Sequence, residues 1–226
     1  RFADPRVRQA FAHAINKREL IDGVVLGLAR EAHGPIRPNT WAFTDRVKRY
    51  EYDPERAKAL LKEAGVPNPS FTMMTPTTAD GQRIAQVVQA MVKEAGFDVK
   101  IQSTEFATSL NMADKGDFEA YVLAWSGRAD PDGNLYSFNA CKQPLNYSGY
   151  CVPEVDALLD RSRSERDPAE RKKAYEQIAA RVLKDRPIVY LYHRNWLWAY
   201  NAKLTGMRSI PDGLLRVTGL KLTDVR

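Results

Sequence analysis

The chain has 226 residues, of which 44% are apolar and 27% are charged, a composition typical of a globular protein with one large domain or two small ones. It contains no uninterrupted apolar run of the length that a transmembrane helix needs, which excludes a membrane span. A net charge of +6 would suit nucleic acid, but the Lys and Arg residues lie in segments that also carry Asp and Glu, so we expect no nucleic-acid partner.

Capping residues and apolar periodicity predict most of the helices. Asp4-Pro5 and Asp53-Pro54 each combine an N-cap with a first-turn proline, and Asp167-Pro168 repeats this device later in the chain. Apolar residues at helical spacing over 84–95 predict a longer helix that ends at Gly96. A further short helix is expected over roughly 107–115.

Short β-branched or aromatic segments bounded by turns predict strands over 71–74, 99–103, 120–124 and 188–192. The order strand–helix–strand over 71–103 predicts a parallel pair joined by a right-handed crossover. This part of the chain is therefore expected to be an α/β unit. Five aromatic residues alternate at strand spacing, which is typical of a core or a sheet surface; they are Tyr190, Tyr192, Trp196, Trp198 and Tyr200.

Two segments follow predicted parallel strands, where ligands of open α/β sheets bind. The first holds the small and hydroxyl-bearing residues Thr75, Pro76 and Thr77. The second runs from Trp125 to Gly133 and combines an aromatic ring, a flexible backbone and charges of both signs. Long loops of this kind usually bind something. The alternative is a structural loop in which Trp125 fills the core.

The two cysteines, Cys141 and Cys151, flank a turn-rich segment that is able to bring its ends together. They are either two unrelated thiols or a local disulfide, and the absence of metal ligands nearby in the sequence favours the disulfide. A disulfide indicates an oxidising compartment outside the cytoplasm.

No catalytic or metal-binding motif is evident. The three histidines, His13, His33 and His193, are far apart and lack partners at metal-ligand spacing, so each is expected to be a surface or packed residue. Asp130 and Asp132 are better explained by an Asp-Pro-Asp-Gly turn than by a cation site. We therefore expect no metal, no cofactor and no enzymatic activity. The alternative is a hydrolytic enzyme or accessory domain that uses the 125–132 loop.

Several motifs in one order resemble the second half of the bacterial extracytoplasmic solute-binding proteins of family 5. The motifs are DPRVRQAF at 4–11, GPIRP at 34–38, YDPERAKALL at 52–61, WSGRADPDG at 125–133, NYSGY at 146–150 and PEVDALL at 153–159. The resemblance implies a periplasmic-binding-protein-like lobe of type II, with a central mixed, largely parallel sheet flanked by helices. Residues 1–217 would form the carboxy-terminal ligand-binding lobe, and residues 218–226 a return segment toward a first lobe.

The resemblance also implies a function in transport. Proteins of this family capture peptides, opines or similar small solutes and deliver them to the membrane permease of an ATP-driven (ABC) importer. The chain is accordingly expected to be periplasmic, to act as a monomer and to bind a small molecule without changing it.

The same resemblance assigns the candidate ligand-binding residues. The cleft loop contributes Trp125, Ser126, Gly127, Arg128 and Asp130. Some dipeptide-binding relatives carry a bridged loop after this segment, which here would present Asn146 and Tyr147 to the cleft above the Cys141–Cys151 bridge.

One position departs from the peptide-binding pattern. In peptide-binding relatives an Asp shortly after the loop tryptophan receives the amino terminus of the peptide, whereas Arg128 stands three residues after Trp125 here, in a loop that is one residue shorter. Arg128 is expected either to bind a ligand carboxylate or to pair with Asp130 or Asp132 and order the loop.

Overall fold

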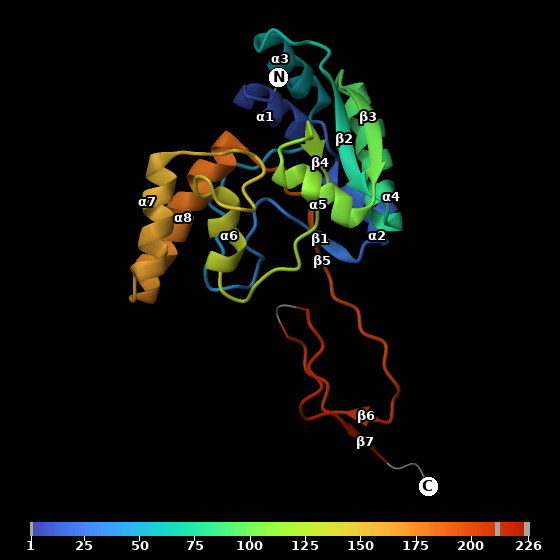
Figure 1. The fold of residues 1–226 in the computed structure, drawn as a ribbon, viewed down its shortest axis with the longest axis vertical. Coiled ribbons are helices and arrows are strands. Elements are labelled where there is room, and N and C mark those ends of the chain that lie inside the picture. Colours follow the sequence, from blue (N-terminus) through green and yellow to red (C-terminus); the bar gives the residue numbers. More distant parts are fainter. Residues whose placement is uncertain (1, 211–212, 224–226) are drawn as a thin grey trace.

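A computed structural model describes residues 2–210 and 213–223. Figure 1 shows a body of two adjoining parts, an α/β half and a helical half, from which the last part of the chain projects. No helix in these two ranges has both the length and the apolar character needed to cross a membrane.

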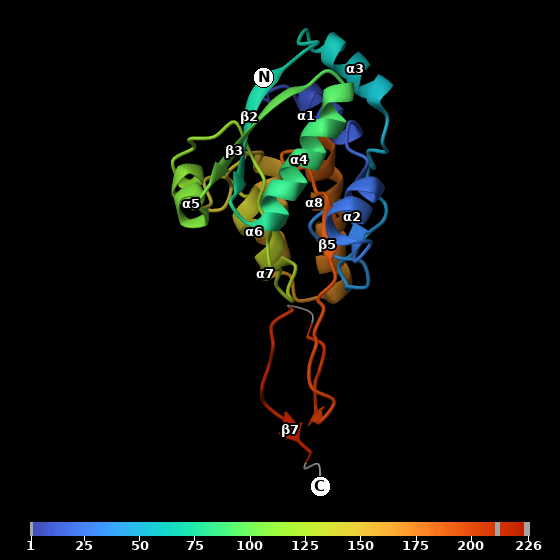
Figure 2. The same ribbon diagram turned by 90° about the vertical axis from the view of Figure 1, so that its right-hand side faces the viewer.

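The α/β half contains a three-stranded parallel sheet in the order β3-β2-β4. Its strands are β2 (Ser70–Pro76), β3 (Asp98–Thr104) and β4 (Ala120–Tyr121). The connection from β2 to β3 is α4 (Ala79–Glu94), which packs against both strands (Figure 2). The predicted strand–helix–strand unit and its parallel pairing are therefore confirmed.

The remaining helices of the α/β half are α1 (Pro5–His13), α2 (Lys17–Val25), α3 (Pro54–Glu63) and α5 (Phe106–Asp114). As predicted, Asp4 and Asp53 cap α1 and α3 and accept hydrogen bonds from backbone N–H groups. Helix α2, capped by Asn16, was not predicted from the periodicity. These helices and the sheet share one core that includes Val7, Leu61, Phe71 and Val88.

The helical half consists of α6 (Asp132–Asn139), α7 (Pro153–Ser164) and α8 (Pro168–Asp185), which surround a second core. Asp167 caps α8 as predicted, accepting from the N–H groups of Ala169 and Glu170. The two halves are joined by Arg8 of α1, whose guanidinium donates to the carbonyl oxygens of Asp185 (2.7 Å) and Arg186 (3.1 Å). Arg8 thereby satisfies carbonyl groups that the end of α8 leaves without a helical partner.

Three predictions about local structure were wrong. The strand expected over 120–124 contains only residues 120 and 121, because the chain leaves this edge of the sheet soon after β4. The strand expected over 188–192 is β5 (Tyr192–Arg194), which pairs antiparallel with β1 (Ala29–Glu31), apart from the main sheet. The Asp-Pro-Asp-Gly turn is the first turn of α6, since Pro131 stands at the N-cap and Asp132 is already helical.

The chain beyond β5 extends away from the body as an arm, residues 195–210 and 213–223 (Figures 1 and 2). Its only described pairing is between the short strands β6 (Leu204–Thr205) and β7 (Lys221–Leu222). Of the five alternating aromatic residues, only Tyr192 lies in a strand, while Trp196 and Trp198 are each 44% exposed on the arm. The expected place in a core or on a sheet surface is therefore found for Tyr192, which also packs against the first core, but not for Trp196 and Trp198. Residues 224–226 of the expected return segment lie outside the described residues.

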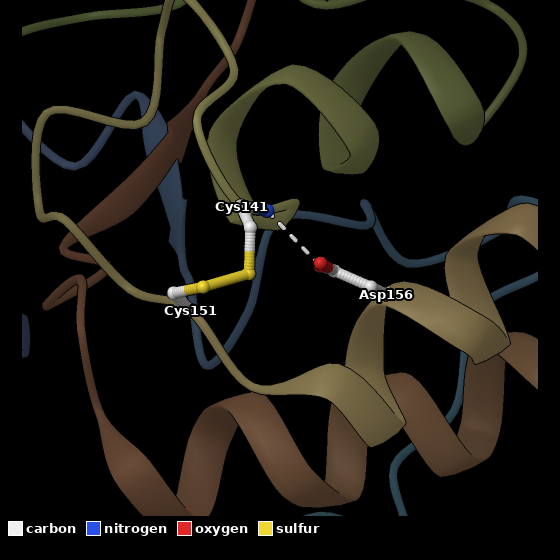
Figure 3. Close-up of side chains that lie close together, drawn as sticks. All are labelled: Cys141, Cys151 and Asp156. Atoms are coloured by element: carbon white, nitrogen blue, oxygen red, sulfur yellow. Dashed lines mark hydrogen bonds between the residues drawn. A yellow bond between two sulfur atoms is a disulfide. The ribbon is translucent and has the colours of Figure 1, made fainter.

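The disulfide between Cys141 and Cys151 is present and closes the connection between α6 and α7 (Figure 3). The side chain of Asp156 at the start of α7 lies beside it and accepts a hydrogen bond from the backbone N–H of Cys141 (3.0 Å). Asp156 and the two sulfur atoms lie close enough to hold a metal ion, but cysteines in a disulfide have no thiolate to offer. The cluster is therefore a structural clasp.

We predict that replacing both cysteines with Ser lowers the free energy of unfolding by about 2–3 kcal/mol, because the disulfide restricts the unfolded chain over a short loop. Chemical denaturation of the oxidised protein and of the Cys141→Ser, Cys151→Ser variant measures this difference. Treatment with a reductant should destabilise only the protein with both cysteines. Equal stability of the two proteins under oxidising conditions would contradict the prediction.

His33 and His193 are both half-buried. Burial, followed by repulsion from the cations Lys17 and Arg49, lowers the pKa of His33 to about 4. Burial, followed by repulsion from Arg37 and His33, lowers the pKa of His193 to about 4 as well. Both imidazoles are therefore neutral in the folded protein at neutral pH.

We predict that the free energy of unfolding decreases as the pH falls from about 6.5, the usual pKa of an unfolded histidine, toward 4. In this interval the unfolded chain binds more protons than the folded one, so acid favours unfolding. Denaturant titrations between pH 7.5 and pH 4.5 measure the slope. The His33→Asn, His193→Asn variant should have a shallower slope, and an unchanged slope would show that other groups cause it.

Candidate functional site

The loop between β4 and α6 carries the largest group of predicted ligand-binding residues. Trp125 is 43% exposed, so it is not the core residue that the alternative interpretation required. Its indole ring and the ring of Phe138 on α6 pack in a T-shaped arrangement, with ring centroids 5.0 Å apart. Gly127 has a φ of 84°, a conformation that glycine adopts without steric cost, and it turns the chain between Trp125 and Arg128.

The two aspartates of this loop are engaged by arginines from α7 and α8. Arg171 of α8 donates to both carboxylate oxygens of Asp130, at 2.8 and 2.9 Å. Arg163 of α7 lies 2.9 Å from a carboxylate oxygen of Asp132. Burial alone would raise the pKa of Asp130, but the hydrogen bonds from Arg171 and from the backbone of Asp132 lower it. Both aspartates are thus already paired with a cation.

Arg128 pairs with neither aspartate, which excludes the interpretation in which it forms an ion pair with Asp130 or Asp132. Its guanidinium lies over the ring of Trp125, 4.3 Å from the centroid, and donates to Ser126 Oγ (3.1 Å) and to the carbonyl oxygen of Gly127 (2.8 Å). Among the described residues it makes no ion pair.

These residues line a hollow of about 260 Å³ between the loop and the helices, formed by Arg128, Asp130, Asp132, Gly133, Arg163 and Arg171. Three guanidinium groups and two carboxylates leave this hollow with an excess of one positive charge. That charge belongs to Arg128, because the other two arginines are matched by the aspartates. The arrangement suits a ligand with one anionic group, since a guanidinium binds carboxylates through paired hydrogen bonds.

Asn134 on α6 is a site residue that the sequence analysis missed. Its side-chain oxygen accepts from the indole N–H of Trp125 (3.1 Å) and from the backbone N–H of Arg128 (2.8 Å). Its amide group donates to the carbonyl oxygens of Arg128 (2.8 Å) and Asp130 (3.3 Å). The only local signal was an Asn in the first turn of an unpredicted helix.

The segment after β2 offers less surface than predicted. The side chains of Thr75 and Pro76 are buried, and Thr75 has an exposed fraction of 0%. Thr77 is exposed, and its backbone N–H donates to the carbonyl oxygen of Thr104 at the end of β3 (3.1 Å). Of the three, only Thr77 presents its side chain to a ligand in this conformation.

The disulfide loop holds the last two predicted residues. Asn146 is used within the loop: its amide donates to the carbonyl oxygens of Ala140 and Tyr150, and its oxygen accepts from the backbone N–H of Tyr150. Tyr147 donates to a carboxylate oxygen of Asp114 on α5 (3.1 Å). Asn146 therefore shapes the loop, and Tyr147 ties it to the α/β half.

The structure does not join all of the predicted residues into one network. Trp125, Ser126, Gly127, Arg128 and Asp130 lie together on the loop that Asn134 and Arg171 hold. Within residues 2–210 and 213–223, no hydrogen bond, ion pair or ring contact links this loop to Thr77, Asn146 or Tyr147. The loop beside the hollow is therefore the centre of the candidate site.

Comparison with known proteins gives a consistent result. The model of the bacterial extracellular solute-binding proteins, family 5 (middle part), matches residues 1–146. The chain is 32% identical over 200 residues to the dipeptide-binding protein of Escherichia coli K12, covering 84% of this chain and 37% of that protein. It is 31% identical over 237 residues to the glutathione-binding protein GsiB of Pectobacterium atrosepticum, covering 99% of this chain and 46% of that protein.

Solved structures agree with the fold. The periplasmic binding protein DppA of Helicobacter pylori, in complex with the peptide STSA, has a TM-score of 0.84 at 30% identity over 98% of this chain and 44% of that one. The binding protein AgaA of A. tumefaciens R10, in complex with agropinic acid, has a TM-score of 0.83 at 26% identity over 100% of this chain and 48% of that one. The chain thus spans less than half the length of these proteins.

Proposed function

Because the chain belongs to the bacterial extracellular solute-binding proteins of family 5, we propose that it is one ligand-binding lobe of the substrate-binding component of an ATP-driven importer. The observation that carries this proposal is the preformed loop with an exposed Trp125 and an Arg128 that has no carboxylate partner among the described residues. The proposed partners are a small solute and a membrane permease, and the proposed compartment is extracytoplasmic. The disulfide supports that compartment.

The proposed ligand carries a carboxylate that Arg128 receives. The excess positive charge of the hollow supports this choice, as do relatives whose names or structures give peptides, glutathione or agropinic acid as ligands. Trp125 offers an apolar ring face beside the carboxylate position. An ammonium group is disfavoured at this point because Arg128 would repel it.

The chain matches less than half of the length of its relatives, which supports the presence of a second lobe in the parent protein. Large apolar side chains on the arm are exposed, among them Leu197 (65%) and Val217 (71%), and burial of such surface stabilises a protein in water. We place the arm against that second lobe, with the ligand enclosed between the two. In a protein whose two lobes close around the ligand, each lobe supplies part of the binding energy.

A hydrolytic function has no specific observation in its favour. The relatives reported above are binding proteins, and Ser126 accepts its hydrogen bond from a guanidinium, which is not a general base. Monomeric state and the absence of a nucleic-acid partner stay predictions.

We predict that native mass spectrometry of the parent protein with both lobes, purified from its source compartment, detects a bound carboxylate-bearing solute of a few hundred daltons. The chain of residues 1–226 alone should bind the same solute weakly or not at all, because half of the contacts are missing. Tight binding by this chain would contradict the two-lobe proposal. Turnover of the solute would instead support the hydrolytic alternative.

We predict that Arg128→Ala in the parent protein weakens binding of the identified anionic solute by about 1.5–3 kcal/mol, the usual contribution of a hydrogen bond to a charged group. Isothermal titration calorimetry measures the difference. Arg18→Ala is the matched control, because Arg18 is an exposed arginine on α2 outside the site. Unchanged affinity of the Arg128→Ala variant would remove Arg128 from the site.

A further inference from the structure

The position of Arg128 depends on the first turn of α6. Asn134 holds the backbone of Arg128 on both sides of its Cα atom, because its side chain accepts from the N–H of Arg128 and donates to the carbonyl oxygen of Arg128. The same Asn134 oxygen accepts from the indole N–H of Trp125. One side chain therefore fixes both the cation and the ring on which that cation lies.

Gly133 provides the space for the arginine side chain. A Cβ atom at position 133 would lie 2.8 Å from both Cβ and Cγ of Arg128. Such distances are well inside van der Waals contact, and the atoms concerned are near the backbone, so the side chain has no free end that is able to move away. Any residue other than glycine at position 133 therefore requires Arg128 or the backbone beside it to shift.

We infer that Asn134 and Gly133 are the positioning residues of this site, which hold the Arg128 guanidinium over Trp125 as a preformed receptor for a carboxylate. The inference rests on the proposed ligand-binding role of Arg128. A long arginine side chain normally loses conformational freedom when it binds, and that loss weakens binding. In this protein the Arg128 side chain is already ordered without ligand, because stacking and hydrogen bonds fix it at one end of the hollow. Binding therefore costs little further conformational entropy of this side chain.

The inference also explains why arginine is accommodated at this position. The two aspartates that would otherwise neutralise Arg128 are paired with Arg163 and Arg171. The carbonyl oxygen of Asp130 is bound by Asn134. Asn134 therefore acts through Arg128, because it holds the backbone that presents this unpaired cation to the hollow.

The test uses acetate and acetamide as probes of equal size that differ in charge. Nuclear magnetic resonance of the ¹⁵N-labelled parent protein with both lobes follows the Trp125 indole N–H and the Arg128 Nε–H during titration. We expect acetate, but not acetamide, to shift both signals. In Asn134→Ala and in Gly133→Ala, acetate should bind roughly three- to tenfold more weakly, which corresponds to the ordering of one long side chain.

A second readout needs no ligand. Nuclear Overhauser contacts between the Trp125 ring and the Arg128 side chain should be present in the unmodified parent protein and lost in Asn134→Ala and Gly133→Ala. Matched controls are Asn111→Ala, an exposed asparagine on α5, and Gly23→Ala, a helical glycine whose added Cβ meets nothing within 4 Å. Both controls should retain the contacts and the acetate affinity.

The outcomes separate the two proposals. If acetate shifts neither signal in the unmodified parent protein, or if Arg128→Ala leaves the acetate affinity unchanged, the role of Arg128 in ligand binding is overturned and the positioning role with it. If Arg128→Ala abolishes binding while Asn134→Ala and Gly133→Ala retain full affinity and the ring contacts, only the positioning role is overturned. Loss of affinity in both positioning variants, with folded spectra and unchanged controls, supports the inference.

Discussion

The bidentate ion pair between Arg171 and Asp130 is the contact on which the candidate site depends. It joins the loop to α8 through two hydrogen bonds of 2.8 and 2.9 Å, a geometry that fixes orientation as well as distance. Asp130 is paired with Arg171, and Asp132 is paired with Arg163. Arg128, the third cation of the hollow, therefore has no carboxylate partner among the described residues. The charge that the site offers to a ligand is thus set by ion pairs that do not themselves need to touch it.

The surrounding structure holds this loop on rigid supports. Asn134 belongs to α6, and α6 packs in the same core as α7 and α8. The connection that follows α6 is closed by the Cys141–Cys151 bridge, and within it Asn146 satisfies backbone groups on both sides of its turn. The hydrogen bond from Tyr147 to Asp114 then links this connection to the α/β half. If the loop binds ligand as proposed, residues held in this way keep their geometry before ligand arrives, which lowers the ordering cost of binding.

The arm presents the opposite situation. Many of its large apolar side chains are exposed, and its only described ladder is the two-residue pairing of β6 with β7. A ladder of that length contributes little stability alone, so the arm needs another surface to bury its aromatic and aliphatic residues. The body, which has two cores of its own, does not supply that surface. This contrast between a packed body and an apolar arm agrees with a chain that spans less than half the length of its relatives.

The sequence by itself determined the features that local chemistry controls: the caps Asp4, Asp53 and Asp167, the parallel β2–α4–β3 unit, the disulfide, and the loop that begins at Trp125. Only the tertiary structure decided that Thr75 is buried, that Asn146 serves its own loop, that β5 pairs with β1, and that Arg128 rather than an aspartate lacks a partner. The physical reason is that caps and short-loop closure depend on neighbours within a few residues. The partner of a charge, in contrast, is chosen by side chains such as Arg171, 41 residues from Asp130 along the chain, which only packing brings into contact.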